Sequence, residues 1–206
     1  MVQRPDRQLI IRGLPLADGG GPRCGHVENV ADVELGTGPR PGEALALRWS
    51  DVDLKSTPPR LTFSGTIIRL KGKKEDGKGL IRQEWTKTDS GYRTVVIPPF
   101  VVETLKRVKE EAEDNDLDLV FTSRDGGIWD PHNFNRLWRQ ARGTKFEWVT
   151  PKTFRKTVAS MIAEEYGPRA PAQQLGHAND SVTKRHYIDQ PTVAPDFTTA
   201  LNRLAG

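Results

Sequence analysis

The chain has 206 residues, of which 35% are hydrophobic and 28% charged, with a formal net charge of +4 and a pI of about 9.3. A single cysteine, Cys24, excludes a disulfide framework and a cysteine-rich metal site. No apolar run approaches the roughly 20 residues that cross a bilayer, and the first residues lack the apolar core of a signal peptide. We therefore expect a globular cytoplasmic protein, and the basic balance favours a polyanionic partner.

The first 35 residues show no clear periodicity. The stretch ADGGGPRCG at 17–25 contains four glycines and a proline, which disfavour a helix interior. We predict an irregular leader over residues 1–35.

A short helix and several strands are predicted from Thr37 onward. GEALALRW follows Pro41, a residue suited to a first helical turn. LTFSGTIIRL, LIRQEWTK and YRTVVIPP are rich in β-branched and aromatic residues and predict strands. TDSG between the last two is a turn signal, which places Lys87 at the mouth of a predicted β-hairpin.

Basic charge is concentrated around these strands. Between Arg69 and Arg93 there are eight Lys or Arg residues against four Asp or Glu, a surplus equal to that of the whole chain. Two interpretations stay open with about equal weight: a solvated loop at KGKKEDGKG, or a hairpin that contacts phosphates.

The second half of the chain predicts helices. Val101, Leu105, Val108 and Ala112 share one helical face, and a final amphipathic helix carries Phe197, Leu201 and Leu204. Asp130-Pro131 and Thr150-Pro151 are both start signals, an N-cap followed by a first-turn proline. Gly176 is expected to end a short helix, AQQL.

Three basic residues follow the second start signal. Lys152, Arg155 and Lys156 lie on the helix face opposite Phe154 and Val158, and no acidic residue offsets them at i+3 or i+4. Such a face indicates an external anion, with chance clustering as the alternative. In the later segment LGHANDSVTKRHYID, His177 follows a glycine turn and Tyr187 comes ten residues later; alone, each is most simply a structural residue.

Taken together and in order, these segments resemble the catalytic domain of the tyrosine recombinase or phage integrase family. TGPRPGEALALRW is similar to the family's first box, which makes Arg40 the first catalytic arginine and Glu43 its supporting acid. TPKTFRKT is similar to the second box, with Lys152 at a His-or-Lys position, Arg155 as the second arginine and Lys156 beside it. LGH gives His177 the third-box role, HY supplies His186 and the nucleophile Tyr187, and WTKTDSGYRTVVIP resembles the hairpin whose lysine is Lys87.

The resemblance implies an α+β fold, mainly helical with a small antiparallel β-sheet or hairpin. It covers residues 36–190 as the catalytic domain, followed by a tail helix at 191–206 that docks either on its own domain or on a neighbouring protomer. Residues 1–35 are then a truncated or drifted N-terminal region, because the family carries a separate DNA-binding domain and further helices ahead of the first box.

The resemblance also implies a chemistry: a tyrosine oxygen attacks phosphorus in DNA and leaves a 3′-phosphotyrosine, so that rejoining needs no ATP. Two always-charged arginines suit the non-bridging oxygens of the transition state, and a lysine suits proton donation to the leaving oxygen. No metal or other cofactor is expected. The implied partners are double-stranded DNA attachment sites, a homo-oligomer (a tetramer) on DNA and accessory DNA-bending proteins, in a bacterial cytoplasm or a phage-infected host.

One alternative stays open at this stage. Pro39 stands directly before Arg40, where an apolar residue is expected, and restricts the turn. A catalytically impaired DNA-binding remnant of a prophage or mobile-element integrase would keep the basic face but fail to align the site.

Overall fold

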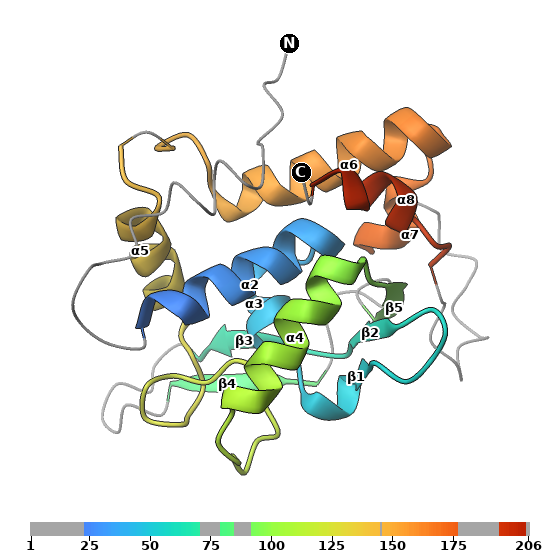
Figure 1. Cartoon of the computed structure of the whole chain (residues 1–206). Helices are drawn as coiled ribbons and strands as arrows, with labels where there is room; N and C mark the ends of the chain where they lie inside the picture. The colour runs from blue at the N-terminus through green and yellow to red at the C-terminus, as the bar shows by residue number, and fades with distance from the viewer. Residues whose placement is uncertain (1–22, 71–78, 85–91, 145, 177–193, 205–206) are drawn as a thin grey trace.

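The computed structural model describes residues 23–70, 79–84, 92–144, 146–176 and 194–204. Helix α2 (Arg23–Thr37) lies at the centre of the molecule and packs against α6 (Pro151–Tyr166), α4 (Pro99–Glu111) and α5 (Pro131–Ala141) (Figure 1). Its side chains from Val27 to Thr37 are almost all buried. From Val27 onward the helix is therefore covered on every side and forms the axis of the core.

The prediction of an irregular leader was wrong for residues 23–35, which form most of α2. In the stretch 17–25, the glycine run 19–21 and Pro22 precede the helix, and Gly25 is the one glycine of that stretch inside it. A helix that is buried all round needs no apolar stripe, and Asn29, Asp32 and Glu34 interrupt its pattern. Residues 1–22 lie outside the described part of the chain.

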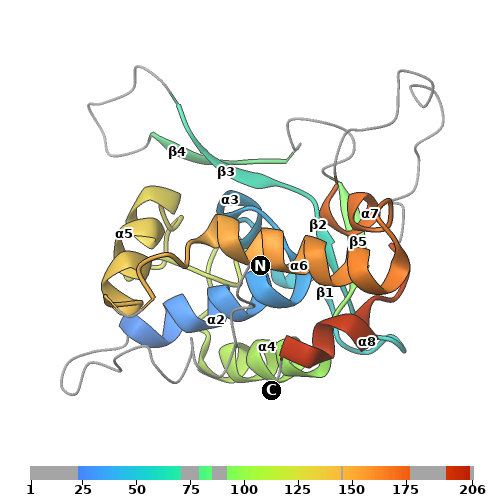
Figure 2. The same ribbon diagram turned by 90° about the horizontal axis from the view of Figure 1, so that it is seen from above.

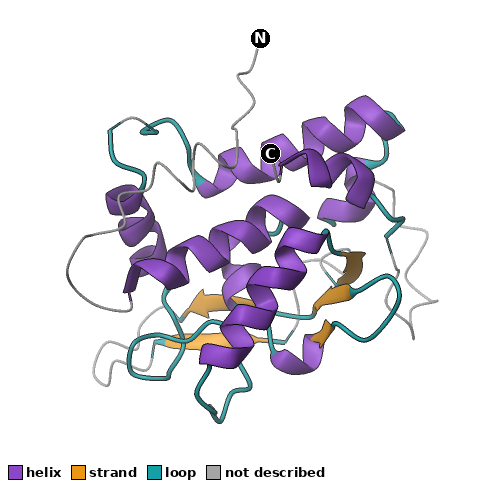
Figure 3. Ribbon diagram, in the orientation of Figure 1, coloured by secondary structure: helices purple, strands orange, loops and turns teal. Residues whose placement is uncertain are grey.

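The strands form two small antiparallel sheets on one side of the helices (Figure 3). One sheet has the order β1-β2-β5, made of β1 (Val52–Asp53), β2 (Arg60–Phe63) and β5 (Arg93–Val96). In the other, β3 (Thr66–Arg69) pairs with β4 (Leu80–Gln83). The predicted hairpin between residues 80–87 and 92–99 was thus wrong in its pairing: β4 joins β3, while β5 joins β2.

Proline is the first residue of five of the described helices. The Asp130 carboxylate accepts a hydrogen bond from the His132 N–H ahead of α5, and the Thr150 hydroxyl accepts one from the Thr153 N–H ahead of α6. Helices α3 (Pro41–Leu45) and α7 (Pro171–Leu175) also begin at a proline. These starts confirm the sequence signals, because proline lacks only an N–H that the first turn leaves unused.

The tail packs on its own domain. Helix α8 (Thr198–Leu201) and a 3₁₀ turn (Asn202–Leu204) follow Phe197, whose ring meets that of Tyr166 at 5.0 Å between centroids. Arg203 and Glu165 form an ion pair at 2.7 Å. The predicted fold class, mainly helical with a small antiparallel sheet, is confirmed, and no helix in the described ranges is long and apolar enough to cross a membrane.

Candidate active site

Arg155 joins three parts of the chain. It projects from the second turn of α6; its Nη1 donates a hydrogen bond to the Gly38 carbonyl at 2.6 Å and its Nη2 to the Leu175 carbonyl at 2.8 Å. Gly38 follows α2 and precedes Arg40, while Leu175 ends α7 two residues before His177. Arg155, the predicted second catalytic arginine, therefore holds the segment before Arg40 and the segment before His177 against α6.

Two glycines make this approach possible. Gly38 has a φ of 74°, and a Cβ there would lie 2.4 Å from Cδ2 of Leu175. Gly176 ends α7 with a φ of 64° and donates its N–H to the Ala172 carbonyl. Both positions need a left-handed backbone that other residues adopt only with strain.

Arg40 and Glu43 form a closed unit at the start of α3. The Arg40 N–H donates to Oε2 of Glu43 at 3.1 Å, and Nη1 of Arg40 donates to Oε1 at 2.7 Å. The Glu43 side chain is 3% exposed and that of Arg40 57% exposed. The buried Glu43 carboxylate thus holds the Arg40 guanidinium, which is otherwise open to solvent.

Arg93 completes this network, and the sequence analysis did not select it. Its side chain is 3% exposed; Nη2 donates to Oε2 of Glu43 at 3.0 Å and Nε to the Gln174 carbonyl at 2.8 Å. The signal in the sequence was an arginine within the predicted strand RTVV, all four residues of which are buried in the structure. A buried arginine requires a partner, so its presence in such a strand indicates an ion pair.

The site keeps its charges at neutral pH. Burial, followed by the nearby positive charge of Arg40, lowers the pKa of Arg155 to about 10, so the guanidinium stays protonated. Burial alone would raise the pKa of Glu43, but the charge of Arg93 and the hydrogen bonds from Arg40 outweigh it, and the pKa lies below its usual value. The result is one buried carboxylate surrounded by three arginines.

The remaining predicted residues fall into two groups. Lys152 and Lys156 are exposed in the first two turns of α6, on the helix that carries Arg155. A second group lies outside the described residues: Lys87, His177, His186 and Tyr187. The structure therefore brings Arg40, Glu43 and Arg155 together, and in the described part of the chain no three His, Cys, Asp or Glu side chains gather where they could hold a metal ion.

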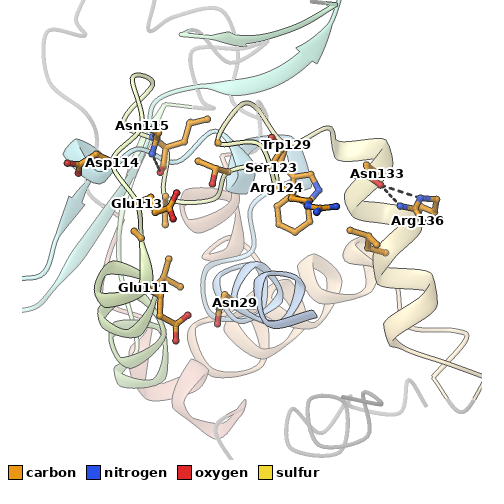
Figure 4. A pocket seen from close by; sticks show the side chains of 17 residues that line it. Asn29, Glu111, Glu113, Asp114, Asn115, Ser123, Arg124, Trp129, Asn133 and Arg136 are labelled. Atoms are coloured by element: carbon orange, nitrogen blue, oxygen red, sulfur yellow. Dashed lines mark hydrogen bonds between the residues drawn. The ribbon is translucent and has the colours of Figure 1, made fainter. Parts of the chain in front are cut away.

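A pocket lies away from this site, beside the N-terminal half of α2 (Figure 4). Asn29 of α2 and Trp129 line it, and Glu111, Glu113 and Asp114 form its acidic wall. Asn29 is nine residues before Gly38, about 13 Å along the helix axis at 1.5 Å per residue. Arg124 and Arg136 also line it, so its charge does not single out one class of ligand.

Comparison with known proteins places the chain in a family. The model of the phage integrase family matches residues 26–192, which is most of the chain. The chain belongs to the phage integrase family. It is 29% identical over 172 residues to an integrase of Staphylococcus phage L54a, a match that covers 78% of this chain and 47% of that protein.

A tyrosine recombinase XerC-like protein of Caldanaerobacter subterraneus subsp. tengcongensis is 28% identical over 174 residues, covering 75% of this chain and 43% of the relative. This phage integrase family member thus spans less than half the length of both curated relatives.

Solved structures share the fold. The integrase of transposon Tn1549, in complex with a circular intermediate DNA, superposes with a TM-score of 0.66 at 20% identity over 84% of this chain and 56% of that one. XerA recombinase gives 0.56 at 22% identity, over 84% of this chain and 53% of that chain. At these identities the likeness establishes the architecture of the family's catalytic domain.

Proposed function

We propose that this chain is a tyrosine site-specific recombinase domain that cleaves and rejoins DNA through a 3′-phosphotyrosine at Tyr187. Membership of the phage integrase family supports this proposal. The observation that carries it is the pair of arginines, Arg40 and Arg155, brought to one place from segments 115 residues apart in the chain. The three arginines of this cluster outnumber its one carboxylate, Glu43, and the remaining positive charge favours an anionic ligand.

In this proposal the two arginines bind the non-bridging oxygens of the scissile phosphate. Arg155 has five N–H donors and uses two on backbone carbonyls, so donors remain for the phosphate. Negative charge on those oxygens grows as the tyrosine oxygen attacks phosphorus. Fixed guanidiniums therefore stabilise the transition state more than the bound substrate.

Proton transfer is assigned to residues of the family motifs. Lys87 donates a proton to the leaving 5′-oxygen, a task that suits an amine whose pKa can fall on desolvation. Lys152 adds positive charge at the start of α6, which favours the ionised form of the Tyr187 phenol, while only its neutral amine form can accept the phenol proton. His177 donates a hydrogen bond to a phosphate oxygen, while Lys156 and His186 play supporting roles.

The energy of the cleaved phosphodiester bond is kept in the phosphotyrosine bond that replaces it. Attack by Tyr187 breaks the bond from phosphorus to the 5′-oxygen and forms a phosphotyrosine ester; attack by a 5′-hydroxyl on that ester reverses the exchange. Neither ATP nor a metal is needed in this scheme, because arginines and lysines neutralise the phosphate. The proposed partners are double-stranded attachment sites, further copies of the chain in a tetramer on DNA, and accessory DNA-bending proteins.

The proposal is tested with a suicide duplex that carries the attachment site and a nick next to the cleavage position. The protein should form a covalent adduct that survives denaturing electrophoresis, in EDTA and without ATP. The Tyr187→Phe variant should bind the duplex equally well and form no adduct, because it lacks only the attacking oxygen.

The control variant is Tyr166→Phe, which changes a tyrosine that packs on Phe197 away from the arginine network. It should form adduct like the unmodified chain. Binding without adduct, even when the longer relatives' N-terminal region is supplied, would overturn the proposal and support a DNA-binding remnant instead.

A further inference from the structure

We propose that Arg93 is a positioning residue for DNA cleavage: by holding the Glu43 carboxylate and the end of α7, it fixes the Arg40 guanidinium at the phosphate. This inference rests on the proposed function. Arg93 reacts with nothing itself, since its side chain is 3% exposed and its contacts are internal. It acts through two neighbours, Glu43 and Gln174.

The first step concerns what holds Arg40. Its side chain is 57% exposed and its hydrogen bond goes to Oε1 of Glu43. A long, exposed side chain samples many rotamers unless an anchor selects one. The orientation of the Arg40 guanidinium therefore depends on where the Glu43 carboxylate stands.

The second step concerns what holds Glu43. Its Oε2 accepts from the Arg40 backbone at 3.1 Å and from Nη2 of Arg93 at 3.0 Å. Arg93 is the source of the largest charge effect that keeps the carboxyl ionised against burial. Without that guanidinium, the buried carboxyl would favour its neutral form and bind Arg40 more weakly.

The third step concerns the rigidity of Arg93 itself. Its guanidinium lies 4.6 Å from the centroid of the Phe63 ring, and Phe63 is its paired residue across β2 and β5. Its Nε donates to the Gln174 carbonyl, and the next carbonyl, that of Leu175, accepts from Arg155. Two arginines thus hold consecutive carbonyls at the end of α7, just before His177.

This geometry needs an arginine. The planar fork donates from Nε in one direction and from Nη2 in another, to acceptors on α7 and α3. A lysine keeps the charge but has one compact ammonium on a flexible stem. Arg93→Lys should therefore preserve the charge of the site while loosening its alignment.

The experiment is a double-mutant cycle on single-turnover cleavage of the nicked duplex, with Arg93→Lys, Arg40→Ala and the double variant. Arg93→Lys should slow cleavage by about 10²-fold, the loss typical of a 1 Å misplacement, with little change in the Kd for DNA. The double variant should cleave no more slowly than Arg40→Ala alone, because residues that act through one group are not additive.

A matched control separates positioning from stability. Thr104→Val removes a buried hydrogen bond to Asp32 at 2.7 Å, on the α2–α4 interface. It should lower the melting temperature and leave the cleavage rate unchanged. If Arg93→Lys melts below the assay temperature, Glu43→Gln tests the same link and should show the same loss without additivity.

The outcomes are distinguishable. Suppose that the wild-type chain cleaves the duplex. If Arg93→Lys then cleaves at the same rate, or if the rate losses of the two single variants multiply in the double variant, the role of Arg93 is overturned and the proposed function still stands. No adduct from the wild-type chain would overturn the proposed function, and the role of Arg93 with it.

Discussion

Arg155 has both a structural and a proposed chemical role, and the two draw on different donors. Its Nη1 and Nη2 atoms each hold a carbonyl, one after α2 and one at the end of α7. A guanidinium fixed at two points loses little further freedom when it binds a phosphate. Preorganisation of this kind lowers the cost of reaching the transition state.

We predict that Arg155→Ala lowers the cleavage rate by about 10²–10³-fold or more, as for the loss of one oxyanion donor. The Kd for DNA should rise far less, because affinity is spread over many phosphate contacts. Single-turnover cleavage and a binding titration measure the two effects. Equal losses in both would count against the assignment, and Arg136→Ala, at an exposed position on α5, serves as control.

At the scale of single residues, the sequence predicted the arginines and the acid that belong to family motifs, but it did not predict Arg93, whose role depends on its contacts in the fold. Arg40, Glu43 and Arg155 belong to motifs, and the structure joins them. Arg93 has no motif of its own, and its importance follows from two acceptors, Glu43 and the Gln174 carbonyl, 50 and 81 residues away in the chain. Partners so distant cannot be deduced from local patterns.

Helix α2 carries an unusual residue in its last turn. Glu34 is fully buried, and neither of its carboxylate oxygens has a hydrogen-bond partner among the described residues. Burial raises the pKa of this carboxyl well above its usual value. Because the folded state binds the proton more tightly, the cost of Glu34 is smallest below its ordinary pKa of 4.5 and grows as the pH rises above it.

We predict that Glu34→Met, a change to an unbranched apolar side chain of similar length, raises the free energy of unfolding by about 1–3 kcal/mol at pH 5, the cost of one unsatisfied buried polar group. The gain should be larger at pH 8. Urea unfolding at both pH values measures it, with Glu103→Met on the exposed face of α4 as the neutral control. A loss of stability at both pH values would mean that the carboxyl has a stabilising partner.

The elements themselves were predictable where local chemistry defines them. The helix starts at Pro41, Pro131 and Pro151 follow from proline and capping side chains. The pairing of β4 with β3 was not predictable, because TDSG resembles a hairpin turn and register depends on non-local packing. Helix α2 was missed because a fully buried helix has no polar face.

At the scale of the molecule, charge is unevenly distributed over the described residues. Arg40 directly precedes α3, and Lys152, Arg155 and Lys156 lie in the first two turns of α6. Six acidic residues lie between 110 and 118, at the end of α4 and in the loop after it. Figure 2 shows α4 on the opposite side of α2 from β3 and β4. A net charge of only +4 therefore understates the positive charge near Arg155, which favours the proposed DNA partner.

This distribution of charge, together with the proposed function, predicts how DNA binding responds to salt. The logarithm of the binding constant should fall linearly with the logarithm of salt concentration, with a slope of about −0.9 per neutralised phosphate. Lys152→Gln and Lys156→Gln should each reduce the magnitude of the slope by about 1, because each removes one phosphate contact. Lys106→Gln, at an exposed position on α4, should leave it unchanged. Fluorescence anisotropy at several salt concentrations measures the slopes, and a flat response of the wild-type chain, or equal effects of all three variants, would contradict a DNA surface at α6.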